Sequence, residues 1–476
     1  MADLSGLFLE TGIVDVSKRI ESGALTGEDI RDEVKRAVAS SEGEVQAWVV
    51  VDPERIAEKS FTDLQRPYGY HAHGLRGIPF GAKDIFNTKD FPTERGSLAW
   101  EGYMPGNNAR VLDSLGSHGA VLIGKTVTAE LAVDEESVCR NPHNLRYSPG
   151  TSSGGSAVAC ATGMVPFALA TQSGASIARP ASFTGVFGYK PSLGLVPRTG
   201  VLKTADTLDT VGFLASRAEN LRPVLEGMRV RGADYPFVYA NIDCAPERTV
   251  QQPERLRIGV LRTPWWESSE IEVRSAFDRC LGAVDSDHSL EVEEISWPTF
   301  LDEVHSLHHL LYCKSLAYYF SEEYEKYQSG FSKVLKEKLE IGRGISGPQY
   351  MDAVKRQDEI SSSLDLVLSE FDAVITLSTT QTAPLRGDYP SADPSLIWTF
   401  TGIPAAAFPL ELSSSALPIG AQIIGRRWDD FRVIALMEKL AVSGAIPSRS
   451  LPTTYEAGQT MSSKSATRVG NPHGLA

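Results

Sequence analysis

Cysteine is scarce in this chain: only five of its 476 residues are cysteine, and no two of them form a CxxC pair. An odd number of widely spaced cysteines provides neither a disulfide framework nor a structural zinc site. We therefore expect a reducing, cytoplasmic environment and no metal. Cys160, the cysteine nearest the serine-rich turns described below, lies in the small apolar segment VACATG, which favours a packed core thiol over a nucleophile.

A basic surface and a long apolar run are also lacking. Lysine and arginine number 46 against 60 aspartates and glutamates, which gives a formal net charge of −14. Nucleic-acid binding generally needs a basic footprint, so we expect no nucleic-acid partner. No apolar run reaches the ~18 residues that could span a bilayer, and the beginning of the chain has no signal-peptide pattern, so we expect no membrane association.

The overall composition, 42% hydrophobic and 22% charged, is ordinary for a globular enzyme. A strand, a helix and a second strand follow one another between residues 78 and 124, which is typical of a βαβ unit in a largely parallel sheet. Apolar runs bounded by turn residues predict further buried strands at 165–170, 257–261 and 372–378. The region 301–341 is predicted to be mostly helical.

Two serine-bearing turns separated by a small-residue segment are the most informative feature. GTSSGGS at 150–156 contains Ser152, and QSGAS at 172–176 contains Ser176. Gly174 and Ala175 allow backbone N–H groups to come close to a bound oxygen, as an oxyanion requires. The stretch supplies no histidine that could activate a serine.

Lys83 can supply the missing base. It lies in the short apolar strand 78–85, where desolvation lowers the pKa of an amine and lets its neutral form accept a proton. The hydroxyl of Ser152 can link Lys83 to Ser176, because a hydroxyl both donates and accepts. The alternatives are a surface lysine and an ordinary turn serine. The order of the three residues and their flanking motifs favour the catalytic interpretation.

These motifs resemble the amidase signature family of serine–cis-serine–lysine hydrolases. The similar segments are AKD at 82–84, GTSSGGS at 150–156, QSGASIARPAS at 172–182 and GYKPS at 188–192. The resemblance extends from about Leu7 to about Ala445. It implies an α/β fold with a single large mixed, mostly parallel β-sheet flanked by helices on both faces.

The resemblance also implies one domain over residues 1–448. Its core is expected at 60–220 and 370–445, with a variable, substrate-shaping helical region at about 220–345. Residues 449–476 turn polar and are expected to form a flexible tail.

By resemblance, Lys83 is the base, Ser152 the bridging serine and Ser176 the acylated nucleophile. The backbone N–H groups of Ser173, Gly174, Ala175 and Ser176 would form the oxyanion hole. No cofactor is implied.

The chain departs from the family pattern around the nucleophile. Gln172 stands where the family usually has an aspartate, and Ala178 stands where it usually has an arginine. Because the aspartate and the arginine are both absent, neither is left as a buried charge without its partner. Ser153 and Gln172 are predicted to support the catalytic groups or the substrate.

Three further patterns leave alternatives. Trp100 and Tyr103 lie in a long loop at 96–108, and they either wall the substrate pocket or cap the core. His305, His308 and His309 share a helix face within metal-ligand reach, but no metal motif surrounds them. GAVLIGKT at 119–126 fits the P-loop pattern, but its apolar middle predicts a buried strand, so we take the match as chance.

We therefore expect a hydrolase that cleaves the C–N bond of a small or aryl amide. Carbamate (urethane) or ester cleavage by the same acyl chemistry is a close alternative. The amidase subunit of a tRNA-dependent amidotransferase is less favoured because the aspartate and arginine are missing, and a non-catalytic binding protein is the remaining alternative. As partners we expect a small-molecule amide or carbamate and a second copy of the chain in a homodimer.

Overall fold

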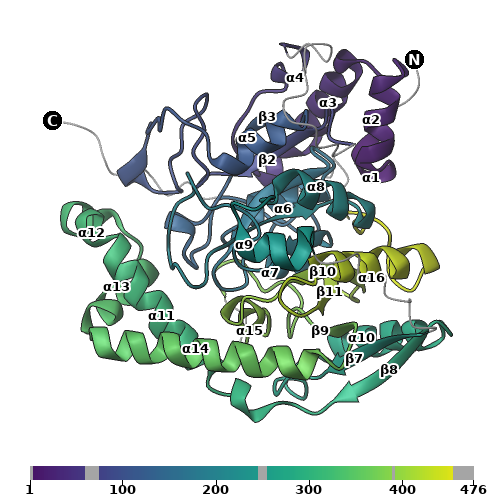
Figure 1. Ribbon diagram of the computed structural model, residues 1–476. Coiled ribbons are helices and arrows are strands. Elements are labelled where there is room, and N and C mark those ends of the chain that lie inside the picture. Colours follow the sequence, from purple (N-terminus) through teal and green to yellow (C-terminus); the bar gives the residue numbers. More distant parts are fainter. Residues whose placement is uncertain (1–3, 59–73, 245–254, 389–391, 454–476) are drawn as a thin grey trace, which may run out of the picture.

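The computed structural model describes residues 4–58, 74–244, 255–388 and 392–453 (Figure 1). The first part of the predicted core segment, 60–73, therefore lies outside the described residues. So does most of the predicted tail, from residue 454 onward. Where the predicted tail begins, it is bound to the core: the N–H of Ser450 donates to the carbonyl of Ser216 at 2.6 Å, and that of Leu451 to the carbonyl of Gly185 at 2.8 Å.

The described strands form one 11-stranded sheet in the order β1-β3-β2-β4-β6-β5-β10-β11-β9-β7-β8. Their bounds are β1 (Trp48–Val51), β2 (Pro79–Lys83), β3 (Val121–Thr126), β4 (Phe167–Gln172), β5 (Phe187–Lys190), β6 (Thr210–Ala215), β7 (Leu256–Leu261), β8 (Leu290–Ile295), β9 (Ala373–Leu377), β10 (Ala405–Leu412) and β11 (Pro418–Ile424). β7 and β8 come from the region predicted to be variable, so that region contributes strands as well as helices.

The mixed α/β sheet is confirmed, but its parallel pairs are restricted to its two sides. β3, β2 and β4 are parallel neighbours, as are β9, β7 and β8. Every pair from β4 across to β9 is antiparallel, as is β1 with β3. The βαβ unit at 78–124 is therefore parallel as predicted. The expectation of a mostly parallel sheet does not hold in the middle, where a short turn joins β10 to β11 and allows only an antiparallel pair.

Helices cover the sheet and add a layer beside it (Figure 1). Their bounds are α1 (Leu7–Glu10), α2 (Ile13–Glu21), α3 (Gly27–Val45), α4 (Arg55–Glu58), α5 (Arg110–Ser117), α6 (Gly154–Ala161), α7 (Ala178–Thr184), α8 (Leu221–Met228), α9 (Pro236–Val238), α10 (Ile271–Asp285), α11 (Val304–Tyr319), α12 (Ser321–Tyr327), α13 (Lys333–Gly344), α14 (Gly347–Leu368), α15 (Ser395–Phe400) and α16 (Asp430–Ser443). Within the described residues, no helix is both long and apolar enough to cross a bilayer.

Two features of this fold position the site. α6 packs on β2 and β4, α7 packs on β10 and β11, and the two helices contact each other. All residues of β2 and β4 are buried, and the rings of Phe80 and Phe167 stack between these strands at 5.2 Å. Because β2 and β4 are parallel, their carboxyl ends meet at one edge of the sheet, next to the starts of α6 and α7.

Candidate active site

Lys83 is the last residue of β2 and is completely buried. Its ammonium nitrogen Nζ donates to three hydroxyl groups: Ser152 Oγ at 2.7 Å, Ser153 Oγ at 3.0 Å and Thr171 Oγ1 at 3.2 Å. The structure therefore brings Lys83 together with Ser152 and with Ser153, whose supporting role stays a prediction. Thr171, on β4, was not anticipated.

These surroundings set the charge of the amine. Burial lowers the pKa of Lys83 to about 7, and the attraction of the Asp209 and Asp134 carboxylates offsets only part of this effect. The three hydroxyls that accept from Lys83 are uncharged and cannot hold a proton on the amine as a carboxylate would. A large fraction of Lys83 is therefore neutral near pH 7 and can accept a proton.

The neighbouring Asp84, just past the end of β2, does not pair with Lys83. Asp84 Oδ1 instead accepts from Lys125 Nζ at 2.8 Å, and both side chains are completely buried. Lys125 also donates to Thr93 Oγ1 at 2.8 Å. The P-loop-like segment 119–126 therefore contains the strand β3. Its lysine, Lys125, forms a buried ion pair with Asp84.

The turn that carries Ser152 needs its glycines. Gly150 has φ of +101°, and a Cβ there would come within 2.5 Å of Pro180 Cα. A Cβ on Gly155 would come within 2.5 Å of the backbone nitrogen of Val127. Ser152 Oγ itself donates to the carbonyl of Ala132 at 3.0 Å. The described residues contain no cis peptide bond, so the cis bond expected from the resemblance is not found at Ser152.

Ser176 lies between β4 and α7, and 7% of its surface is exposed. The two serine turns lie side by side, since Arg179 in α7 donates to Thr151 Oγ1 at 3.1 Å. The hydrogen bonds of the described residues include the link from Lys83 to Ser152 but none from Ser152 to Ser176. The second link of the predicted relay therefore stays a prediction.

Gln172 holds the start of α7. Its Oε1 accepts from the N–H groups of Ile177 at 2.8 Å and Ala178 at 3.0 Å, and its Nε2 donates to Thr399 Oγ1 at 2.8 Å. Gln172 and Thr399 are both completely buried. Gln172 therefore contacts the two backbone N–H groups that directly follow Ser176, and its predicted role in supporting the catalytic groups or the substrate stays a prediction.

Arg179, which follows the expected arginine position by one residue, lies beside this turn with partners that the sequence did not reveal. Arg179 is buried and forms ion pairs with Asp393, which precedes α15, and with Asp134 at 3.5 Å. The cation is therefore displaced by one position from the place where the resemblance expects it, and it finds carboxylates from other segments. Sequence reasoning considered only the pair lost at Gln172 and Ala178, because nothing near Arg179 in the chain predicts its partners.

His308 also reaches the site, from α11 in the region predicted to be variable. Its Nε2 lies 2.6 Å from the carbonyl oxygen of Ser173. Burial lowers the pKa of His308 to about 4, so the ring is neutral at pH 7 and Nε2 carries the donated proton. The three-histidine pattern predicted only a helix face, and no sequence signal singled out His308.

The aromatic loop lies against α12. Trp100 and Tyr103 pack edge to face at 4.9 Å, and the guanidinium of Arg95 lies 3.6 Å from the centre of the Trp100 ring. The loop and α12 line a cavity of about 410 Å³, with Tyr327 on the helix side. In the described residues neither aromatic side chain hydrogen-bonds to a catalytic candidate, so the predicted contact with substrate is not tested.

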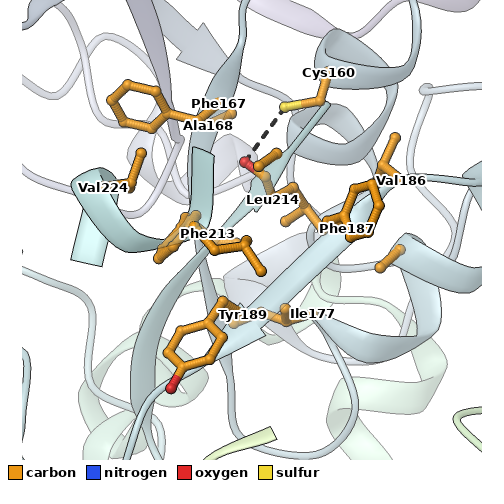
Figure 2. Packing of buried hydrophobic residues seen from close by; sticks show 14 of the residues in the cluster. Cys160, Phe167, Ala168, Ile177, Val186, Phe187, Tyr189, Phe213, Leu214 and Val224 are labelled. Atoms are coloured by element: carbon orange, nitrogen blue, oxygen red, sulfur yellow. Dashed lines mark hydrogen bonds between the residues drawn. The ribbon is translucent and has the colours of Figure 1, made fainter. Parts of the chain in front are cut away.

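Cys160 lies in the core, as expected. Figure 2 shows its sulfur directed at the carbonyl oxygen of Leu214, 3.5 Å away, among buried apolar side chains. Burial raises the pKa of this thiol above its usual range, so the reactive thiolate is disfavoured.

Comparison with known proteins identifies a matching family model, similar curated proteins and solved structures of similar fold. The family model described as Amidase matches residues 31–434. The chain is 28% identical over 474 residues to a glutamyl-tRNA(Gln) amidotransferase subunit from Natranaerobius thermophilus, covering 90% of this chain and 95% of the relative. It is 30% identical over 458 residues to the protein of the same name from Roseiflexus sp. strain RS-1, covering 87% and 93%. The structure of the peptide amidase from Stenotrophomonas maltophilia is similar in fold, with a TM-score of 0.79 at 24% identity, covering 95% of this chain and 100% of that one.

The prediction of partners is wrong in the light of these relatives. It expected only a small-molecule substrate, no nucleic acid and a homodimer. By name, these relatives are subunits of a glutamyl-tRNA(Gln) amidotransferase. The net charge of −14 misled us because it describes one chain and says nothing of the other chains in an assembly.

A family model matches most of the chain, and the motifs of its two serine turns and its buried lysine lie together in the fold. The chain belongs to the Amidase family, the amidase signature enzymes that its sequence resembles.

Proposed function

We propose that this chain hydrolyses the C–N bond of a small or aryl amide through an acyl-enzyme on Ser176. The observation that carries the proposal is the environment of Lys83, a buried amine with a pKa of about 7 that lies 2.7 Å from Ser152. A serine is a weak nucleophile until a base takes its proton, and a neutral lysine at this pKa is suited to that task at neutral pH.

The proposed reaction has two halves. Neutral Lys83 takes a proton from Ser152, and Ser152 takes one from Ser176, whose Oγ then bonds to the amide carbon. Backbone N–H groups of residues 173–176 hold the negative oxygen of the tetrahedral intermediate. The C–N bond breaks as the relayed proton passes to the leaving amine. Water then attacks the ester carbon and releases a carboxylic acid, restoring Ser176.

The substrate class is tested with the full chain and a matched panel, in which one aryl group is presented as an amide, a carbamate (urethane) and an ester. The proposal expects the amide to be cleaved by the wild-type protein and not by Ser176→Ala. Preference for the carbamate or the ester would favour the close alternatives with the same acyl chemistry. Equal cleavage by Ser176→Ala would contradict the nucleophile.

A second candidate function is favoured by the relatives in particular. As the amidase subunit of a glutamyl-tRNA(Gln) amidotransferase, the chain would act with partner subunits on a tRNA-bound substrate. Affinity capture of the tagged full chain from its native cell tests this candidate. Co-purification of stoichiometric partner subunits, with amide transfer to glutamyl-tRNA(Gln) that Ser176→Ala abolishes, would support it. Capture of the chain alone, with amide hydrolysis intact, would contradict it.

A further inference from the structure

The carbonyl groups of residues 173–175, in the turn that carries Ser176, each have a donor. The carbonyl of Ser173 accepts from His308 Nε2 at 2.6 Å, and that of Gly174 accepts from Thr399 Oγ1 at 2.5 Å. The carbonyl of Ala175 accepts from the N–H of Arg179 at 2.9 Å, within the first turn of α7. The orientation of each of these three peptide planes is therefore fixed by a hydrogen bond.

In a trans peptide unit the C=O and the following N–H point in opposite directions. Fixing the carbonyls of residues 173–175 therefore directs the N–H of Gly174 away from His308 and that of Ala175 away from Thr399. The N–H of Ser176 points away from the backbone N–H of Arg179. Among the described residues none of these three N–H groups donates to a protein acceptor. A set of oriented donors without partners is what an oxyanion needs.

Gln172 decides which way the Thr399 hydroxyl points. A threonine hydroxyl has one proton to donate. Gln172 Nε2 donates to Thr399 Oγ1 at 2.8 Å, so the hydroxyl proton is left for the carbonyl of Gly174. An aspartate or glutamate in place of Gln172 could not donate and would compete with Gly174 for the same proton. The amide is therefore matched to Thr399 in a way that a carboxylate is not.

We propose that Gln172, Thr399 and His308 are positioning residues that orient the backbone N–H groups of Gly174, Ala175 and Ser176 toward the negative oxygen of the tetrahedral intermediate. This inference rests on the proposed acyl transfer to Ser176. It assigns a purpose to the chain's departure from the family pattern: a neutral amide–hydroxyl relay and a histidine from α11 hold the turn, in place of the charge pair that the resemblance expects at Gln172 and Ala178.

The test compares two matched pairs of variants of the full chain on the amide that the wild-type protein cleaves best. Thr399→Val keeps the shape and removes the hydroxyl, whereas Thr399→Ser keeps it. His308→Leu removes the donor, whereas His308→Gln keeps an N–H near the place of Nε2. Removing an oxyanion donor costs about 10²–10³ in kcat, so misaligning one is expected to cost on the order of 10- to 100-fold.

The expected result is a loss of kcat in Thr399→Val and His308→Leu with KM within about twofold of wild type, as is typical of an interaction made in the transition state. Thr399→Ser and His308→Gln, which keep a donor, should retain most of the wild-type kcat. Binding of phenylboronic acid, which forms a tetrahedral adduct on a serine, should weaken by a similar factor. Melting curves of all variants are recorded so that unfolding is not mistaken for misalignment.

Failure of the positioning proposal and failure of the proposed function give different results. If the wild-type protein is modified at Ser176 by a serine-directed phosphonate and cleaves amides, but Thr399→Val and His308→Leu keep its kcat and its affinity for phenylboronic acid, the positioning proposal is overturned and the proposed function stands. Equal losses in both members of each pair would also overturn the positioning proposal. If the wild-type protein is neither modified at Ser176 nor active, the proposed function itself fails.

Discussion

Lys83 Nζ lies 2.7 Å from Ser152 Oγ, at a place where neither side chain reaches solvent. The only partners of the amine in the described part of the chain are hydroxyls, because the adjacent Asp84 is neutralised by Lys125. The protein thus gives Lys125 a carboxylate partner and Lys83 only hydroxyl partners in the same small region.

The first prediction concerns catalysis by Lys83. Since burial lowers the pKa of Lys83 to about 7, the neutral amine forms as pH rises, and kcat/KM should increase about tenfold per pH unit below 7 and level off above it. Lys83→Met should lose at least about 100-fold in kcat/KM and show no such rise. Steady-state rates between pH 5 and 9 check this; an unchanged profile in the variant would mean that another base operates.

The second prediction concerns stability. The pKa of Lys83 falls from 10.5 in an unfolded chain to about 7 in the fold, so between these values the unfolded chain binds a proton that the folded chain does not. Folding stability contributed by this site therefore rises with pH from 7 to 10.5, by roughly 5 kcal/mol in all. The melting temperature of Lys83→Met relative to wild type should fall as pH rises from 7 to 10. The matched control, Lys333→Met on an exposed lysine, should show no trend.

The third prediction concerns the pair of Lys125 with Asp84. Lys125→Met leaves a carboxylate completely buried without its cation, which costs about 3–5 kcal/mol of unfolding free energy. The double variant Asp84→Leu/Lys125→Met removes both charges and should be more stable than the single variant. Urea unfolding of the three proteins measures this. A single variant as stable as wild type would show that the pair is not needed to bury Asp84.

The fourth prediction concerns Arg179. Its guanidinium pairs with Asp393, whose pKa is raised because burial outweighs the attraction of Arg179. Arg179→Met should therefore destabilise the fold by about 3 kcal/mol, and Arg179→Met/Asp393→Leu should recover part of that loss. Chemical unfolding of both variants provides the test, and additive losses in the double variant would indicate that the two residues act independently.

Much of the site could be predicted from the sequence because its residues are close to recognisable strands and turns. Lys83 is the last residue of an apolar strand, and Ser152 and Ser176 lie in glycine-containing turns before short helices. The glycines themselves follow from local geometry, as at Gly150 with its positive φ.

The rest depends on contacts between distant segments. His308 reaches Ser173 across 135 residues of chain, and Thr399 reaches Gly174 across 225. The histidine pattern at 305–309 pointed only to a helix face, and Thr399 lies in no motif, so only the fold reveals these two contacts. The same holds for the antiparallel middle of the sheet, because an apolar run predicts a strand but not the direction of its neighbours.

The rate at which a fluorophosphonate modifies the protein, measured against pH with mapping of the modified residue, tests the central claim most directly. The account predicts a single adduct on Ser176, with a rate that rises through pH 7 in the wild-type protein and is low and independent of pH in Lys83→Met. An adduct on another residue, or the same pH dependence in both proteins, would contradict it.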